Sequence, residues 1–229
     1  MGRVSDPETE HGVPEPEPRS GPPRRVRLVG RAMNGLVARA PALWPLLKRP
    51  MARYFDDRAL GWDERTGAPG ASHLAPLAVA VTKIDRRPER ALDLGTGTGV
   101  AALFLAREFP HAAVRGVDIS EAMIRQAQAK VGLDPDGRVA FKVADAASLP
   151  FPDDHFDLVA QLNMPPFFAE TARSLRHGGH VIVATSSGDR TPFYTPDAVL
   201  ERGFGRRGFV TVTAGRIGSG SYWVARKGE

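Results

Sequence analysis

Ala91-Leu92-Asp93-Leu94-Gly95-Thr96-Gly97-Thr98-Gly99 is the stretch that decides the fold of this 229-residue chain. It is a short apolar run that closes on an acid and is followed by three glycines at alternate positions. The run is typical of a buried parallel strand, and the glycines are typical of a turn where backbone passes close to a ligand. The spacing of Val100 to Phe109 predicts a helix after the turn. Exposed N–H groups at a helix start, with no side chains in front of them, favour a nucleotide-like ligand.

Asp93 narrows the class of ligand. A dinucleotide fingerprint, G-x-G-x-x-G/A, is matched only by the offset set Gly97, Gly99 and Ala102, and this set leaves Gly95 unused. A fixed negative charge two residues before the first glycine would repel a phosphate, whereas it suits a ligand that carries an ammonium group. A nicotinamide-dependent oxidoreductase is therefore disfavoured.

The stretch from Asp93 to Gly99 resembles the first motif of the class I S-adenosylmethionine-dependent methyltransferases, an acid-x-Gly-x-Gly-x-Gly turn, at every specified position. The resemblance covers about Ala91 to Lys227. It implies an α/β fold with a Rossmann-like, doubly wound, mostly parallel seven-stranded sheet and a terminal antiparallel strand. It also implies S-adenosyl-L-methionine as the methyl donor.

Strands and helices alternate through most of the remaining chain, which predicts a parallel sheet with right-handed crossovers. We expect Ser120 to cap the helix that follows the second strand, and Ser72 to cap a helix that runs to Ile84. Further strands are predicted at 113–117, 139–144, 156–161 and 180–185, further helices at 165–176 and 195–200, and a terminal hairpin at 209–213 and 221–225 around Gly215 to Gly220.

Ligands of doubly wound sheets lie beyond the carboxyl ends of the strands, and three of the predicted strands end at an acid. Asp118 is placed to accept from both ribose hydroxyls, because a carboxylate offers two oxygens. The resemblance implies that Asp93 and the glycine turn contact the methionine part, and that Asp145 accepts from the adenine amino group. The predicted cofactor-binding residues are Asp93, Gly95, Thr96, Gly97, Gly99, Asp118, Ile119, Ser120, Ala144, Asp145, Ala146 and Gln161.

The acceptor side of the site is less well defined by the sequence. Asn163-Met164-Pro165-Pro166-Phe167 is similar to the Asn-Pro-Pro-aromatic motif of amino-group methyltransferases, but Met164 separates the Asn from the prolines. The alternative is a proline-started helix whose aromatic side chains pack into the core or the substrate pocket. The candidate substrate-binding residues are Asn163, Phe167 and Phe168, and the candidate general bases are Tyr194, Asp189, Ser186 and Tyr54, for which ordinary loop or packing roles are the alternative.

Charge and composition divide the chain into three parts. Residues 1–23 hold two basic and five acidic residues and are predicted to be a disordered tail, and residues 24–84 are predicted to form a basic helical lid before the methyltransferase domain at 85–229. Residues 24–53 hold eight basic residues and no acid, mixed with apolar ones. This mixture predicts either contact with an anionic membrane surface or an ordinary lid helix with a solvated basic face. From Tyr54 onward the 21 basic and 21 acidic residues balance, which disfavours nucleic acid as a partner.

Several classes of protein are excluded or disfavoured by composition. The absence of cysteine rules out disulfides, thiolate metal sites and cysteine nucleophiles. The histidines show no metal-ligand spacing, and His155, His177 and His180 precede or open strands at the opposite end of the sheet, so we expect no metal. No apolar run is long enough to span a bilayer and no signal peptide is visible, so a cytoplasmic, non-secreted protein is expected.

The leading hypothesis is a methyltransferase that acts on a small, lipophilic metabolite. Leu149-Pro150-Phe151-Pro152-Asp153 and Leu175-Arg176-His177-Gly178-Gly179 resemble the branch that includes quinone and other small-metabolite C- and O-methyltransferases. The alternatives are a nucleic-acid or protein N-methyltransferase and a non-catalytic cofactor-binding protein of the same fold.

Overall fold

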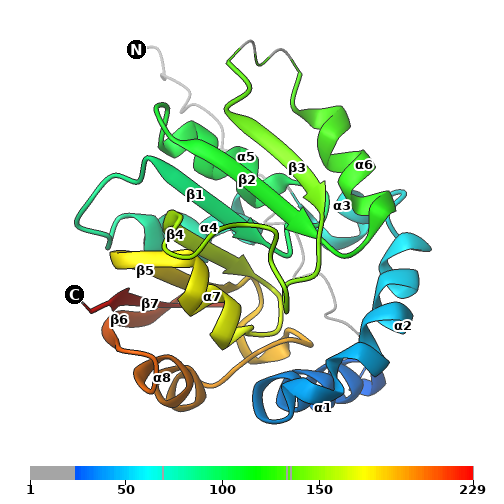
Figure 1. Ribbon diagram of the computed structural model, residues 1–229. Coiled ribbons are helices and arrows are strands. Elements are labelled where there is room, and N and C mark those ends of the chain that lie inside the picture. The colour runs from blue at the N-terminus through cyan, green and yellow to red at the C-terminus, as the bar shows by residue number, and fades with distance from the viewer. Residues whose placement is uncertain (1–23, 69, 133, 135, 229) are drawn as a thin grey trace, which may run out of the picture.

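A computed structural model describes residues 24–228 except 69, 133 and 135, so the tail predicted at 1–23 lies outside the described residues. The strands form one sheet in the order β3-β2-β1-β4-β5-β7-β6 (Figure 1). Neighbours from β3 to β5 are parallel, and β7 runs antiparallel to both β5 and β6. The predicted seven-stranded sheet with an antiparallel strand at its end is confirmed. The strands are β1 (Arg90–Leu94), β2 (Ala113–Asp118), β3 (Val139–Val143), β4 (Phe156–Leu162), β5 (Leu175–Thr185), β6 (Phe209–Ile217) and β7 (Gly220–Lys227).

Helices cover both faces of this sheet (Figure 1). On one face α4 (Ala71–Val81) packs against β5 and β7, and α5 (Val100–Glu108) and α6 (Glu121–Lys130) pack against β1 to β3, in a core that includes Leu77 and Leu105. On the other face α7 (Phe168–Ser174) and α8 (Asp197–Gly205) pack around Trp223. The central strands β1 and β4 are covered on both faces and are buried along almost their whole length, whereas the edge strands β3 and β6 are largely exposed.

The N-terminal segment adds three helices outside these layers. We call α1 (Arg24–Arg39), α2 (Trp44–Asp56) and α3 (Trp62–Thr66) the lid helices; a 3-10 turn, η1 (Pro41–Leu43), joins the first two, and a second, η2 (Gly188–Arg190), follows β5. Val37 and Trp44 are buried in the same core as α7 and α8, so the lid is fastened to that side of the domain. The fourth N-terminal helix, α4, packs on β5 and β7 and belongs to the helical layer of the sheet.

One local prediction in this segment was wrong. Helix α2 continues across Pro50, because a proline removes only one hydrogen bond and the buried Trp44 and Met51 hold both sides of the helix. Ser72 does not cap α4: the N-cap is Gly70, and no side chain caps the helix, which ends at Val81.

The C-terminal half departs from prediction at three boundaries. The helix expected at 165–176 is shorter, since α7 begins at Phe168 and the chain is already in β5 from Leu175. Helix α8 runs beyond its predicted end to Gly205. Gly215 was predicted in the hairpin turn but lies within β6, where an added Cβ would come 2.6 Å from the Tyr222 hydroxyl. Gly215 therefore leaves room for the Tyr222 side chain. The spacing of glycines in the sequence does not distinguish such a strand residue from a turn glycine.

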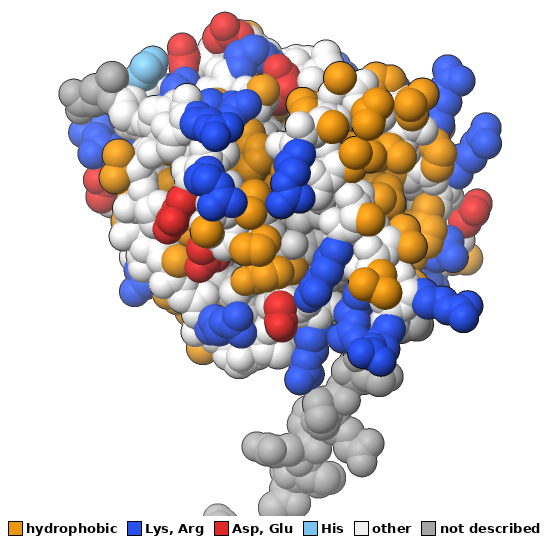
Figure 2. Space-filling model, turned by 90° about the horizontal axis from the view of Figure 1, so that it is seen from below, with side chains coloured by type: hydrophobic (Ala, Val, Ile, Leu, Met, Phe, Trp, Pro, Cys, Tyr) orange, Lys and Arg blue, Asp and Glu red, His pale blue; other side chains and the backbone are white. Residues whose placement is uncertain are grey.

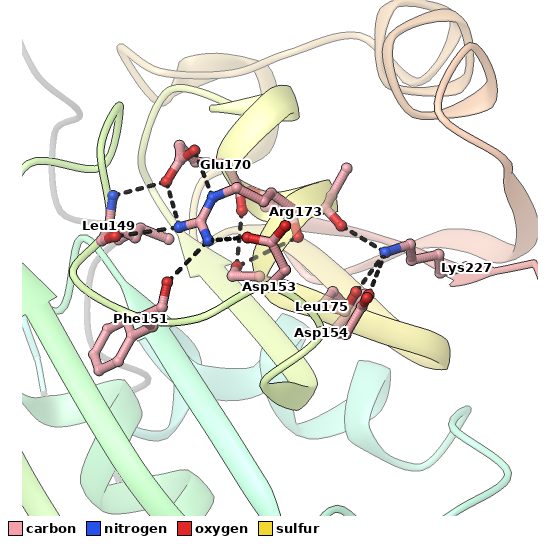
Figure 3. Close-up of polar contacts among 11 residues, drawn as sticks. Leu149, Phe151, Asp153, Asp154, Glu170, Arg173, Leu175 and Lys227 are labelled. Atoms are coloured by element: carbon pink, nitrogen blue, oxygen red, sulfur yellow. Dashed lines mark hydrogen bonds and ion pairs between the residues drawn. The ribbon is translucent and has the colours of Figure 1, made fainter.

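One arginine organises the loop that leads into β4 (Figure 3). Arg173 on α7 donates to the carbonyl oxygens of Leu149 and Phe151 and pairs with Asp153 at 2.6 Å and Glu170 at 2.8 Å. The Glu170 carboxylate in turn accepts from the Leu149 N–H at 2.7 Å. We call this group, residues 149–153 with Glu170 and Arg173, the Arg173 clamp.

Candidate functional site

Gly95, Gly97 and Gly99 after β1 each have a positive φ, but their surroundings differ. Gly97 (φ 52°) faces open space, since a Cβ added there would meet nothing within 4 Å. A Cβ on Gly99 would collide with the Phe141 ring, and one on Gly95 would come 2.6 Å from the Met164 sulfur. The loop therefore packs at its two ends and leaves its middle exposed to a ligand.

Asp93 is the most deeply buried acid in this region. Its side chain is 1% exposed, Thr96 Oγ1 donates to Oδ2 at 2.6 Å, and Oδ1 has no hydrogen-bond partner of ordinary geometry. Burial raises the pKa of Asp93 to about 7, partly offset by the Thr96 hydroxyl and the Ala102 amide, while Asp118 adds to the rise. A buried acid with an unused oxygen is the environment that a cationic ligand group would stabilise.

Asp118, at the end of β2, holds the loops on either side of it. Its two oxygens accept from the Gly97 and Ser120 N–H groups, each at 2.9 Å. Burial raises the pKa of Asp118 in spite of these backbone donors, and Asp56 raises it further. Each carboxylate oxygen has a second lone pair, so both can accept from a ligand hydroxyl as well. Ser120 caps α6 as predicted, since its Oγ accepts from the Met123 N–H at 3.1 Å.

Asp145 lies just beyond β3 and accepts hydrogen bonds from two residues of lid helix α2. Trp44 Nε1 donates to Oδ1 at 2.7 Å, and Lys48 Nζ lies 3.2 Å from Oδ2. Next to it is a cavity of about 170 Å³ lined by Ile119 and Asp145 on the domain side and by Lys48, Arg49 and Ala52 on the lid side. Ala144 and Ala146, the two neighbours of Asp145, pack against the core that contains Trp44.

The residues at the end of β4 are engaged with their surroundings. Gln161 is fully buried, and its amide donates to Thr171 Oγ1 at 2.9 Å, while Oε1 has no partner. Asn163 (φ 56°) and Ser186 bond reciprocally: Asn163 Oδ1 accepts from the Ser186 N–H at 2.9 Å, and the amide donates to Ser186 Oγ at 3.0 Å. The pair joins the ends of β4 and β5.

The other candidate residues for the acceptor side are dispersed. Phe167 meets Trp44 edge-on with ring centroids 5.0 Å apart, whereas Phe168 packs on Phe204 of α8. Tyr194 and Asp189 lie in the loop after β5, where their carbonyl oxygens accept from Asn34 and Arg31 of α1. Tyr54 is 41% exposed on α2 and lies under the Arg58 guanidinium.

Two lid acids that the sequence analysis did not single out contact the strand-end region. Asp56 Oδ1 accepts from Ser120 Oγ at 2.6 Å and from the Ala122 N–H at 3.1 Å, at the start of α6. Asp63 accepts from Thr98 Oγ1 and pairs with Lys130. These contacts join residues more than 30 positions apart, so no local pattern indicates them.

The histidines lie elsewhere. His155 stacks on Phe151 beside the Arg173 clamp, His177 Nδ1 lies 2.8 Å from the Gly228 carbonyl oxygen, and His180 is 3.4 Å from Asp85. Among the described residues no group of three or more His, Asp or Glu side chains could hold a metal ion.

Residues 91–179 match a family model described as a methyltransferase domain. The ubiquinone/menaquinone biosynthesis C-methyltransferase of Geobacter sulfurreducens is 35% identical over 114 residues, which are 46% of this chain and 44% of that protein. The chain therefore spans less than half the length of this curated relative.

Solved structures share the fold at low identity. The geranyl diphosphate C-methyltransferase from Streptomyces coelicolor, solved with geranyl diphosphate and S-adenosyl-L-homocysteine, has a TM-score of 0.62 and 16% identity, and the match covers 79% of this chain and 97% of that one. The [4+2]-cyclase SpnF has a TM-score of 0.63 and 20% identity over 78% of this chain and 95% of its own.

Proposed function

Since the chain belongs to the class I S-adenosylmethionine-dependent methyltransferases, we propose that it transfers a methyl group to a small, lipophilic metabolite. The observation that carries the proposal is the placement of Asp93, Asp118 and Asp145 at or just beyond the ends of three neighbouring strands, with the open Gly97 bonded to Asp118. The lipophilic acceptor is suggested by the quinone and geranyl substrates in the names of the two methyltransferases described above.

The residues fit this cofactor part by part. The unpartnered Oδ1 of Asp93 suits the ammonium of the methionine part, and Asp118 can accept from the ribose hydroxyls. Ile119 and Asp145 line a cavity large enough for a flat ring. When bound, S-adenosylmethionine would supply an electrophilic methyl group on a sulfonium: a nucleophile that attacks the methyl carbon in line breaks the carbon–sulfur bond, and S-adenosylhomocysteine is the leaving group.

The chain's own contribution is then mainly positioning, because the leaving group is already activated. A base is needed only where the acceptor must lose a proton. Of the candidate bases, Ser186 has its side chain engaged by Asn163, and Tyr54 is covered by Arg58. Positioning without a strong base fits an acceptor whose attacking atom is already nucleophilic, such as an electron-rich ring carbon or an ionised oxygen.

Calorimetry of the full chain with S-adenosylhomocysteine tests the cofactor assignment. We expect saturable binding, whereas a folded sample that does not bind would refute the proposal. Incubation of cell extract with the protein and isotopically labelled S-adenosylmethionine, followed by mass spectrometry, would then identify the acceptor. Label that appears in protein or nucleic acid would favour the alternative N-methyltransferase, and no labelled product would favour a non-catalytic binding protein.

We further propose that the lid makes peripheral contact with an anionic membrane, from which a lipophilic acceptor would be drawn. Leu28 (67% exposed) and Val29 on α1, with Leu43 and Leu46 (73% exposed) around η1, present large apolar side chains to solvent. They lie within a segment that holds eight basic residues and no acid, and the face seen in Figure 2 shows hydrophobic and basic side chains intermixed. Apolar insertion and attraction to anionic lipid headgroups would act together there.

Flotation with phosphatidylglycerol-containing vesicles tests this contact. We expect binding at low salt that high salt removes, because surface charges are screened. Leu46→Glu should reduce binding, while Val210→Glu, at an equally exposed apolar position on β6, should not. Absence of binding at low salt would favour the alternative of a solvated basic lid face. Among the described residues no helix is long and apolar enough to cross a bilayer.

A further inference from the structure

The carboxylate of Asp145 is oriented from outside its own loop. Trp44 Nε1 donates to Oδ1 at 2.7 Å, and the Ala147 N–H donates to the same oxygen at 2.9 Å. Trp44 is 4% exposed, so its indole has little freedom to turn away. Oδ1 therefore has two donors, and Oδ2, which accepts from Lys48 Nζ at 3.2 Å, has a further lone pair for another donor.

Asp145, which carries this oxygen, lines the small cavity between the domain and the lid. Asp145 and Ile119 form one side of the cavity, and Lys48, Arg49 and Ala52 of α2 form the other. At about 170 Å³ it is smaller than the ~300 Å³ at which whole-ligand pockets begin, so it suits one ring system of a larger ligand. Lys48, whose side chain is 40% exposed, pairs with Asp145 at 3.2 Å on the lid side of the cavity.

Helix α2 is held in place at both ends of the cavity wall. Near its start Trp44 bonds Asp145, and at its end Asp56 accepts from Ser120 and Ala122 at the start of α6. The wall that α2 offers to a ligand is therefore anchored to the two loops that carry Ile119 and Asp145.

We propose that Trp44 is a positioning residue for purine recognition: its indole N–H fixes Oδ1 of Asp145, so that Oδ2 accepts from the exocyclic amino group of adenine in the cavity walled by α2. This inference rests on the proposed function, because it concerns the adenine part of the same cofactor. It makes the lid a part of the cofactor site as well as a cover for the acceptor.

A packing role is the competing explanation, because Trp44 also meets Phe167 edge-on with centroids 5.0 Å apart. The Trp44→Phe variant separates the two, since it keeps an aromatic ring in the core and removes the N–H donor. Two ligands make the separation sharper: S-adenosylhomocysteine carries the 6-amino group, and S-inosylhomocysteine carries an oxo group in its place. Only the first presents an N–H donor on the exocyclic group at position 6, which is the group that the proposal assigns to Asp145 Oδ2.

Calorimetry of the full chain with both ligands is the test. We expect the unaltered protein to prefer S-adenosylhomocysteine, and Trp44→Phe to weaken that ligand about tenfold, the size of one hydrogen bond to a charged group, with little effect on S-inosylhomocysteine. Trp62→Phe, the same substitution on lid helix α3 away from Asp145, should leave both affinities unchanged.

Equal weakening of both ligands by Trp44→Phe would show a packing role and overturn the inference, as would no change for either ligand. In both cases the proposed function stands, because the unaltered protein still binds S-adenosylhomocysteine. If the unaltered, folded protein binds neither ligand, the proposed function fails and the inference fails with it. Thermal unfolding of the two variants checks that each is folded.

Discussion

The Arg173 clamp and the strand ends differ in how the pKa values of their acids are shifted: that of Glu170 is lowered, and those of Asp93 and Asp118 are raised. In the clamp, burial alone would raise the pKa of Glu170, but hydrogen bonds from Arg173 and the Leu149 N–H outweigh it, and the pKa is lowered. At the strand ends, burial prevails and the pKa values of Asp93 and Asp118 are raised. Both oxygens of Glu170 accept hydrogen bonds within the chain, whereas Asp93 Oδ1 has no hydrogen-bond partner of ordinary geometry.

This difference separates acids that stabilise the folded state from acids that destabilise it. A buried carboxylate without a cation destabilises the folded state, so such a group persists where a ligand completes it. Asp145 is intermediate, since Trp44 donates a hydrogen bond to one of its oxygens and Lys48 pairs with the other. We therefore expect substitutions in the clamp to change stability, and substitutions at the strand ends to change binding.

The largest effect is expected for Asp118→Ala. Our proposal gives Asp118 two hydrogen bonds to the ribose, and bonds to a charged acceptor contribute about 1.5–3 kcal/mol each. The dissociation constant for S-adenosylhomocysteine should rise about 100-fold or more, as measured by calorimetry. Asp153→Ala, which removes an exposed clamp acid, is the matched control and should leave the affinity unchanged. An unchanged affinity for Asp118→Ala would remove the ribose assignment.

The Arg173→Ala variant should show the opposite pattern. It leaves the half-buried Glu170 and two carbonyl oxygens of the loop without their partner, so a loss of about 2–4 kcal/mol in the free energy of unfolding is expected. Urea denaturation measures the loss. Arg125→Ala, which removes only an exposed pair with Glu121, should cost under about 0.5 kcal/mol. If a folded Arg173→Ala protein bound the cofactor more weakly, the prediction that the clamp affects stability alone would be wrong.

Asp93→Asn should stabilise the protein at alkaline pH while weakening cofactor binding. Because the folded-state pKa of Asp93, about 7, lies above the unfolded value of 3.8, the folded protein holds this proton more tightly. Its stability therefore falls as pH rises from about 4 to 7 and stays low above that range. We expect Asp93→Asn to be more stable than the unaltered protein at pH 8 by about 1–3 kcal/mol in urea denaturation.

Two outcomes bear on that prediction. A smaller difference at pH 5 than at pH 8 would identify ionisation of Asp93 as the cause. A variant that is less stable at both pH values would contradict the cost assigned to this acid.

The smallest effect is expected for Ser120→Ala. The hydroxyl caps α6 and donates to Asp56, so its loss should lower the free energy of unfolding by about 1 kcal/mol, as for other N-caps. Urea denaturation again provides the measurement, and Ser219→Ala, at an exposed turn hydroxyl, provides the control. A loss as large as that for Arg173→Ala would show that Ser120 holds the lid as well as the helix.

The parts of the fold that follow from short-range patterns were predictable from the sequence. An apolar run that closes on an acid located β1 and β2, and Ser120 before an apolar helical pattern located the start of α6. The parallel arrangement followed from the alternation of strands with helices. The ends of α7 and α8 were not predictable in this way; Phe168 at the start of α7 packs on Phe204 near the end of α8, a contact between residues far apart in the sequence.

The contacts between the lid and the site were beyond such patterns. Trp44 and Asp145 are 101 positions apart, and Asp56 and Ser120 are 64 apart. Nothing in the spacing of a basic, apolar segment says which loop it will cover, because that depends on how the helix sits on a finished sheet. The predicted cofactor residues and acceptor-side residues stay predictions that the experiments above test.

The difference between the two regions is tested most directly by the side-chain carboxyl ¹³C signal of Asp93, followed through a pH titration with and without S-adenosylhomocysteine. In the free protein we expect a midpoint at about 7, and with the ligand a clear downward shift, because its ammonium would stabilise the ionised form. A free-protein midpoint near the ordinary value of about 4, unmoved by the ligand, would contradict the assignment of Asp93 as an acid left for the cofactor.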